Sequence, residues 1–236
     1  MKVFLLHTVR PGLNRFEKLL KERYPHVRPR NMLDDFWIRE VEEHHRFTEN
    51  CRRHLLEVCA SMERSGADLI VCTCSSLTPY LDDVRKFLEI PVVAIDETMA
   101  ARTLEYGDNI LVMATADTAI DAAVQQIEEE ARRQNRNVNI GTLLLDEAGQ
   151  IMRGGGDMAE HDRIILESFR NMGENKYDVI VCAQLSTSHL AEEIGRITRT
   201  PVLTTPMLCI EDLKNYIPDE PSPSDKSALH VDSSAI

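Results

Sequence analysis

An internal duplication without a gap constrains this chain most strongly. The segment DLIVCTCSSL begins at Asp68, and a second copy, DVIVCAQLSTS, begins 110 positions later at Asp178 (178 minus 68). Each copy is followed by a second short apolar run, PVVAI from Pro91 and PVLTT from Pro201. Short apolar runs bounded by turn residues predict strands that are buried on both faces. The chain is therefore predicted to build the same strand–turn–helix–strand unit twice.

The first strands extend the repeat to both halves of the chain. VFLLHT at 3–8 and ILVMAT at 110–115 have the same place ahead of their units. Strands that alternate with helical patterns over short loops predict a mostly parallel sheet with helices on both faces. We therefore expect an α/β protein with two pseudo-symmetric, Rossmann-like (flavodoxin-like) halves and a site in the cleft between them.

Turn residues at Gly107–Asn109 mark the expected boundary between the halves. The first half would comprise 1–106 and about 207–236, and the second half 107–206. The tail 218–236 is rich in Pro, Ser and Asp, so we expect it to be loosely packed.

Local patterns predict several further elements. Apolar residues at three- and four-residue steps predict one helix over Val41–Ser65. Loops are expected over Asn31–Trp37 and over Asp146–Asp157, which contains the GGG run. Pro79 is expected to open a helix in its first turn, with Thr78 as the cap.

Composition excludes several classes of protein. A net charge of −12 argues against nucleic acid or an anionic membrane surface as partner, although it leaves a small acidic substrate open. No apolar run approaches the roughly 18 residues of a membrane span. The six cysteines form no CxxC pattern, which predicts free thiols in a reducing cytosol. Neither a GxGxxG turn nor an HExxH motif is present, so neither a dinucleotide nor a metal is expected.

Small polar side chains follow four of the predicted strands. In a parallel sheet, ligands bind beyond the carboxyl ends of the strands. If the halves face each other, four such ends converge, namely His7–Thr8, Cys74–Ser76, Thr115–Thr118 and Gln184–Thr187. Their neutral hydroxyls suit a carboxylate, together with backbone N–H groups at helix starts. The predicted substrate-binding residues are Thr8, Ser75, Ser76, Thr115, Thr118, Ser186 and Thr187.

Cys74 is the strongest single candidate for chemistry. It lies at a strand end before a polar turn and a helix start, a setting that favours a thiolate. Cys72 and Cys182 lie deeper in their strands and are interpreted as core thiols. His7 lies at a strand end, where it would position a proton or bind a carboxylate, and His189 is a lesser candidate.

These residues together resemble the aspartate/glutamate racemase family, a group that includes hydantoin racemase, maleate isomerase and arylmalonate decarboxylase. The resemblance covers residues 1 to about 212 and rests on Cys74-Ser75-Ser76, the second such strand, the duplicated architecture and the IxVxAT strand at 110–115. It implies a site that is independent of pyridoxal phosphate or any other cofactor, with chemistry at the carbon next to a carboxylate. Dimers are common in the resembled family, so a homodimer is one expected assembly.

The chain departs from the family pattern at the second half. In the family's racemases two cysteines face each other, one removing the alpha proton and the other delivering a proton to the opposite face. The second cysteine falls on Gln184, within Ala183-Gln184-Leu185, and glutamine neither gives nor takes a proton at neutral pH.

Three hypotheses follow from this departure. The first is an enzyme in which Cys74 is the only thiol of the site, with Gln184 holding a substrate oxygen. The second is a racemase with another second base, His7 or Cys182. The third is a small-carboxylate binding protein without catalysis.

Overall fold

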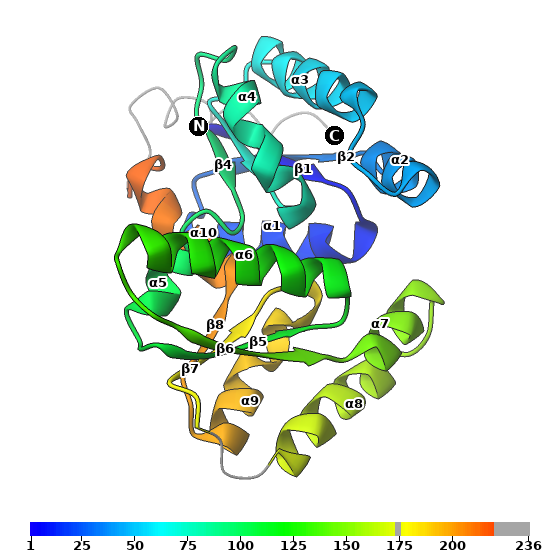
Figure 1. Cartoon of the computed structure of the whole chain (residues 1–236). Helices are drawn as coiled ribbons and strands as arrows, with labels where there is room; N and C mark the ends of the chain where they lie inside the picture. The colour runs from blue at the N-terminus through cyan, green and yellow to red at the C-terminus, as the bar shows by residue number, and fades with distance from the viewer. Residues whose placement is uncertain (173–175, 220–236) are drawn as a thin grey trace. The chain divides into compact units, whose positions relative to one another are not determined.

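The computed structural model describes residues 1–172 and 176–219, and these form two compact units (Figure 1). Unit 1 comprises Met1–Ile95 and the chain from Ile210, and unit 2 comprises Asp96–Cys209. Each unit contains its own four-stranded sheet, in which all pairs of neighbouring strands are parallel. The predicted α/β fold with two repeated parallel sheets is therefore confirmed.

The two sheets have the same strand order. In unit 1 the order is β2-β1-β3-β4, with β1 at Lys2–His7, β2 at Arg28–Leu33, β3 at Leu69–Cys72 and β4 at Val92–Ala94. In unit 2 the order is β6-β5-β7-β8, with β5 at Asn109–Ala114, β6 at Asn139–Leu144, β7 at Val179–Cys182 and β8 at Val202–Thr204.

Helices alternate with the strands in a similar order along the chain in both units. Unit 1 contains α1 (Arg10–Arg23), α2 (Phe36–His44), α3 (Glu49–Arg64), the 3₁₀ helix η1 (Ser75–Tyr80) and α4 (Leu81–Arg85). Unit 2 contains α5 (Met99–Leu104), α6 (Asp117–Arg133), α7 (Asp146–Arg153), α8 (Met158–Asn171), the 3₁₀ helix η2 (Leu185–Leu190) and α9 (Ala191–Thr198). α10 (Thr205–Asp212) carries the chain from unit 2 back to unit 1, where the 3₁₀ helix η3 (Leu213–Asn215) follows. No helix within the described ranges has the length and apolar character that a membrane span requires.

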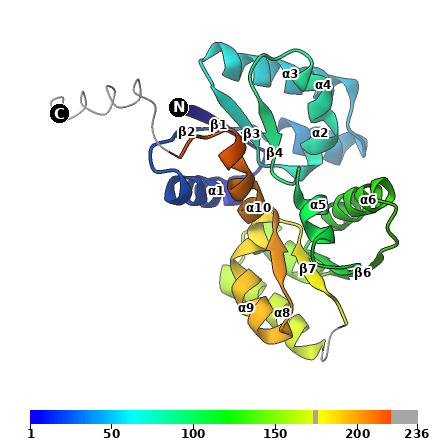
Figure 2. The same cartoon turned by 90° about the vertical axis from the view of Figure 1, so that its left-hand side faces the viewer.

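The inner strands of each sheet are buried on both faces, which is why β1, β3, β5 and β7 are largely apolar. The edge strands β2 and β6 are more exposed and carry polar residues. Within unit 1, Phe4, Leu6 and Ile70 pack with side chains of α3 such as Leu55 and Met62. Within unit 2, α5 and α6 cover one face of the sheet and α8 and α9 the other (Figure 2). The strand ends thus emerge from a rigid core.

The repeated unit is the same in the structure as in the sequence. β3 and β7 are 110 positions apart, as are η1 and η2, and β4 and β8. The repeated aspartate has the same role in both copies. Asp68 Oδ2 accepts a hydrogen bond of 2.6 Å from the backbone N–H of Lys2, and Asp178 Oδ2 accepts one of 2.9 Å from that of Asn109. Each carboxylate therefore caps the start of the neighbouring strand.

The prediction of one continuous helix over Val41–Ser65 is wrong, because the structure has two helices there. α2 ends at His44, and the next residue, His45, adopts a left-handed backbone with φ of 52°. α3 begins after Thr48. The Thr48 hydroxyl accepts a hydrogen bond of 3.2 Å from the backbone N–H of Cys51, a standard helix cap. The apolar spacing continues across this break, so periodicity alone conceals it.

Three loop and cap predictions also need correction. The loop predicted over Asn31–Trp37 is shorter, since β2 runs to Leu33 and α2 begins at Phe36. The loop predicted over Asp146–Asp157 contains α7, whose Ala148 and Gly149 are buried. Pro79 lies inside η1 and does not open a helix, and Thr78 is not its cap.

The boundary between the units does not lie at the turn at Gly107, where the sequence placed it. Unit 2 begins at Asp96 because Met99, Ala100 and Leu104 of α5 pack in the core with α6. Of the tail predicted to be loosely packed, residues 220–236 lie outside the described residues.

Candidate functional site

Cys74 lies at the carboxyl edge of the unit 1 sheet. It follows β3 by two residues, has an extended backbone (φ −123°, ψ 111°) and precedes η1. Its carbonyl accepts a hydrogen bond of 3.0 Å from the N–H of Leu77, which closes the first turn of η1. All six cysteines lie within the described residues, and Cys74 is the one that is not buried. Cys74 is thus the one cysteine with partial access to solvent.

The other predicted residues of unit 1 lie along the same edge, which we call the Cys74 edge (His7, Thr8, Cys74, Ser75 and Ser76). His7 ends β1, and Thr8 follows it as a buried residue. Ser75 is half-buried and Ser76 exposed at the start of η1. The structure therefore brings the unit 1 candidates together.

His7 is already hydrogen-bonded through both ring nitrogens. Its Nε2 lies 3.0 Å from Asn31 Oδ1, and its Nδ1 lies 2.7 Å from the Thr73 hydroxyl. The side chain is only 1% exposed. Burial lowers the pKa of His7 from its ordinary value, although the Asn31 hydrogen bond and the charge of Glu17 oppose the shift. His7 is therefore held neutral, with no nitrogen free for a ligand.

Gln184 occupies in unit 2 the place that Cys74 occupies in unit 1. It follows β7 by two residues, has an extended backbone (φ −132°, ψ 145°) and precedes η2. Its Oε1 accepts hydrogen bonds from the backbone N–H of Thr115 at 2.6 Å and from the Thr115 hydroxyl at 3.0 Å. A backbone N–H only donates, so the atom facing it must be the oxygen. The amide NH₂ of Gln184 consequently points away from Thr115, with two donors to offer.

The remaining candidates of unit 2 divide into two kinds. The hydroxyls of Thr115 and Thr187 are already used, since Thr187 Oγ1 donates to the Gln184 carbonyl at 3.0 Å. Ser186 is half-buried in η2, and Thr118 is exposed near the start of α6. We call this group (Thr115, Thr118, Gln184, Ser186 and Thr187) the Gln184 edge. In it Thr115 supports Gln184, and within the described residues the Gln184 NH₂ has no hydrogen-bond partner.

The thiol of Cys182 is unsuited to proton transfer at neutral pH. Cys182 is buried, and burial raises its pKa to about 12. Cys59 in α3 is in the same condition, with a pKa raised by burial to about 12. Both remain thiols in the core of their units.

His189 belongs to a cluster that the sequence pattern did not reveal. Its Nε2 lies 2.7 Å from Asp162 Oδ2, and His161 Nδ1 lies 2.8 Å from Asp162 Oδ1. Within the described part of the chain, neither His189 Nδ1 nor His161 Nε2 has a hydrogen-bond partner, and both atoms are buried. Asp162 thus orients His189, which lies in the turn that follows Gln184.

Sequence reasoning also missed Thr73, Asn31 and Gly149. Thr73 and Asn31 hold His7, and neither belongs to a recognisable motif. A side chain at Gly149 would place a Cβ 2.1 Å from the carbonyl oxygen of Thr115. Helix α7 therefore packs closely against Thr115, the residue that holds Gln184. A glycine within an otherwise helical pattern was the available signal.

A group of potential metal ligands lies on α2. Ligand atoms of Glu40, Glu43 and His44 lie within 4.8 Å of one another, but Glu43 and His44 are exposed and Glu40 only partly covered. Exposed acidic groups of this kind occur widely on protein surfaces, so the cluster is not a metal centre by itself.

Comparison with known proteins places this geometry in context. Residues 13–211 match the model of a family described as Asp/Glu/Hydantoin racemase. An aspartate racemase from Picrophilus torridus has a similar structure, with a TM-score of 0.65 and 14% identity over 90% of this chain and 92% of that one. So has an allantoin racemase from Klebsiella pneumoniae, with a TM-score of 0.63 and 14% identity over 91% and 86%. A glutamate racemase from Francisella tularensis in complex with D-glutamate has a TM-score of 0.63 and 12% identity over 91% and 79%.

Proposed function

The chain belongs to the Asp/Glu/Hydantoin racemase family, and on this premise we propose that it catalyses proton transfer at the carbon next to a carboxylate in a small molecule, with Cys74 as the acid–base thiol. The observation that carries the proposal is the setting of Cys74. It alone among the six cysteines is not buried, and it lies at the carboxyl edge of a parallel sheet.

In the proposed reaction the Cys74 thiolate removes the alpha proton and becomes a thiol. The electron pair of the broken C–H bond moves into the carboxylate and gives an enediolate. The thiol then returns a proton to carbon, which restores the thiolate. General acid–base catalysis of this kind contributes about 10²- to 10⁴-fold to a rate.

Gln184 is proposed to bind a carboxylate oxygen of the substrate and of the enediolate. Thr115 fixes its oxygen, and this leaves the NH₂ group as an oriented donor. An oriented neutral donor stabilises charge as it develops and costs no reorganisation. We take Gln184 to stand where the racemases of this family carry their second cysteine, so Cys74 would be the only thiol of the site.

One thiol is compatible with decarboxylation followed by protonation on one face, with cis–trans isomerisation through a thiol adduct, or with proton exchange. The test is Cys74→Ala assayed against amino acids, hydantoins, maleate and malonates. We expect turnover of the active substrate to fall by about 10² or more. Cys59→Ala is the matched control, since it removes a buried thiol of the α3 core. Unchanged turnover in Cys74→Ala would exclude Cys74 as the catalyst.

A second candidate function is two-base racemisation in which His189 provides the second acid or base. The His189–Asp162 contact of 2.7 Å is the observation for this candidate, because a carboxylate that accepts from Nε2 leaves a lone pair on Nδ1. Nδ1 is buried, so this role requires that substrate binding expose it. His7 and Cys182 have less support for this role, since His7 has both nitrogens bonded and the pKa of Cys182 is about 12.

Deuterium incorporation separates the two candidates. In D₂O, a two-base racemase washes deuterium into the alpha carbon from both enantiomers, and His189→Gln reduces this exchange for one of them. Exchange from one enantiomer only would support the single-thiol enzyme. A protein that binds the carboxylate but exchanges no proton from either would instead be a binding module.

A further inference from the structure

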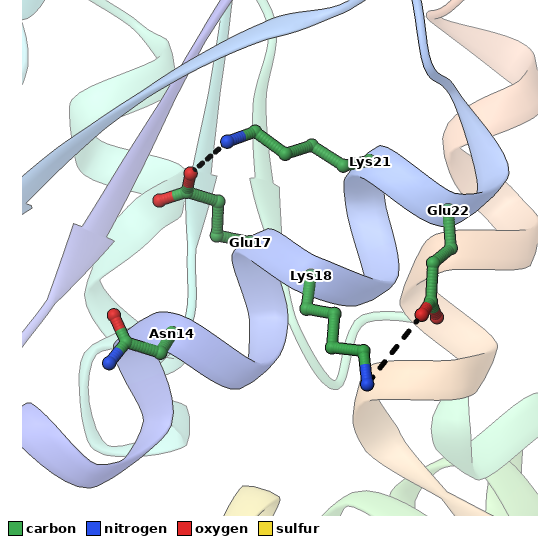
Figure 3. A pocket seen from close by; sticks show the side chains of 5 residues that line it. All are labelled: Asn14, Glu17, Lys18, Lys21 and Glu22. Atoms are coloured by element: carbon green, nitrogen blue, oxygen red, sulfur yellow. Dashed lines mark hydrogen bonds and ion pairs between the residues drawn. The ribbon is translucent and has the colours of Figure 1, made fainter.

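A chain of hydrogen bonds runs from the surface of α1 to the residue before Cys74. Figure 3 shows its outer end, where Glu17 pairs with Lys21 on α1. Both residues line a surface pocket of about 380 Å³. The other carboxylate oxygen of Glu17 accepts a hydrogen bond from Asn31 Nδ2 on the edge strand β2. Asn31 Oδ1 then meets His7 Nε2, and His7 Nδ1 meets the Thr73 hydroxyl.

The chemistry of each group fixes the direction of these bonds. Hydrogen bonds from Lys21 and then from Asn31 keep the pKa of Glu17 below its ordinary value, so Glu17 is a carboxylate and only accepts. Asn31 must therefore turn its NH₂ to Glu17 and its oxygen to His7. An oxygen facing Nε2 requires that nitrogen to donate, which makes the neutral ring the Nε2–H tautomer.

The tautomer determines what Thr73 does. In the Nε2–H form the Nδ1 lone pair accepts the hydroxyl hydrogen of Thr73. The backbone N–H of Thr73 donates to the Leu6 carbonyl at 2.9 Å, and its hydroxyl oxygen lies 3.0 Å from the same carbonyl. Thr73 is thus attached to β1 by backbone and side chain, and it is the residue that leads into Cys74.

We propose that Glu17 and Asn31 are positioning residues that hold His7 as its Nε2–H tautomer, so that the Thr73 hydroxyl fixes the segment carrying Cys74. The role in catalysis rests on the function proposed above. Among the described residues, the groups that face His7 are Asn31 from β2, Thr73 directly after β3 and the charge of Glu17 from α1. The His7 carbonyl accepts a hydrogen bond from the N–H of Asp34.

The experiment uses NMR of the full-length protein to read the His7 tautomer and titration, and alkylation by iodoacetamide to read Cys74. Glu17→Leu removes the acceptor that orients Asn31, whereas Glu17→Gln keeps an acceptor oxygen and should restore the wild-type behaviour. We expect Glu17→Leu to lose the fixed Nε2–H tautomer, to change the pH profile of Cys74 alkylation, and to lower kcat/KM by about tenfold to a hundredfold.

Two further variants make the test specific. Asn31→Asp places a carboxylate on His7 Nε2, so the His7 titration and the acid limb of the Cys74 profile should both move to higher pH. Glu22→Gln is the matched control, because Glu22 pairs with Lys18 on the same helix without touching Asn31 (Figure 3). Glu22→Gln should change neither the His7 titration nor the pH profile of Cys74 alkylation.

The outcomes separate this inference from the proposed function. An unchanged His7 tautomer and an unchanged Cys74 profile in folded Glu17→Leu and Asn31→Asp would overturn the positioning role, even if Cys74→Ala abolishes turnover. If Cys74→Ala leaves turnover intact, the proposed function fails, while the NMR reading of His7 still decides how its tautomer is set.

Discussion

At the residue scale, solvent access distinguishes the cysteines of this chain. Cys72 and Cys74 lie two positions apart, yet Cys72 is buried in β3 and Cys74 is accessible. Cys182 ends β7 and is fully buried. The thiol that follows a strand can take part in chemistry, and the thiols inside strands serve as packing groups.

We predict that iodoacetamide alkylates Cys74 alone in the native protein near pH 8. Burial raises the pKa of Cys59 and of Cys182 to about 12, so neither forms a thiolate there. Peptide mapping by mass spectrometry measures the labelling, and urea, in which all six cysteines should react, is the control. Native labelling of Cys182 as fast as that of Cys74 would contradict the prediction.

We also predict that Gln184→Ala lowers kcat by about 10²- to 10³-fold, the usual cost of losing one donor to a developing oxyanion. The reason is that Thr115 leaves the Gln184 NH₂ free to donate. Steady-state kinetics on the substrate found with the wild type measures the loss. Gln184→Glu is a second variant that tests the donor role directly. Its carboxylate still accepts from Thr115 but has no NH₂, so activity equal to wild type in that variant would rule out a donor role.

At the element scale, helix α7 approaches the strand end that carries Thr115. Gly149 permits this approach, since a Cβ there would lie 2.1 Å from the Thr115 carbonyl oxygen. A backbone atom cannot move aside as a side-chain tip does. The position of the whole helix therefore bears on the orientation of Gln184.

Gly149→Ala is expected to destabilise the protein by about 1–3 kcal/mol through overpacking and to lower activity through Thr115. Gly195→Ala provides the matched control in another helix, α9. There an added Cβ meets its nearest atoms at 3.5 and 3.6 Å, which is ordinary contact, so a gain of about 0.4–1 kcal/mol is expected. Urea unfolding measures both variants. Equal effects of the two substitutions would show that the contact with Thr115 is unimportant.

At the scale of the whole molecule, titrating groups link folding stability to pH. The pKa of His7 is lowered in the folded protein from 6.5, so the unfolded chain binds the proton more tightly. The contribution of His7 to stability is complete above about pH 6.5 and is lost as the pH falls toward its folded pKa. Hydrogen bonds from Asn109, first from its backbone, lower the pKa of Asp178 from 3.8, and that contribution is lost only in stronger acid.

We therefore predict a decline in the free energy of unfolding between pH 7 and pH 5, with a slope from His7 of at most about 1.4 kcal/mol per pH unit. His7→Gln should flatten this decline, because glutamine has no proton to gain. Urea unfolding at several pH values measures it. The exposed His44 serves as the control through His44→Gln, and a decline that is identical in wild type and His7→Gln would disprove the role of His7.

The repeat, the parallel sheets and the places of Cys74 and Gln184 after their strands could be predicted from the sequence alone. These features are local, since buried strands require short apolar runs and the duplication shows them twice at one spacing. The break at His45 and helix α7 escaped prediction, because apolar spacing continues across the former and a glycine run follows the latter.

The pairing of the polar side chains, in contrast, depends on contacts between distant parts of the chain. Gln184 and Thr115 are 69 positions apart, and His7 and Thr73 are 66 apart, so no local pattern reveals their hydrogen bonds. These pairings turn Thr115 from a candidate donor into a support and leave His7 without a free nitrogen. Within the described residues they leave the Gln184 NH₂ without an acceptor and Cys74 as the unburied cysteine, because a hydrogen that is already donated within the protein is not available to a ligand.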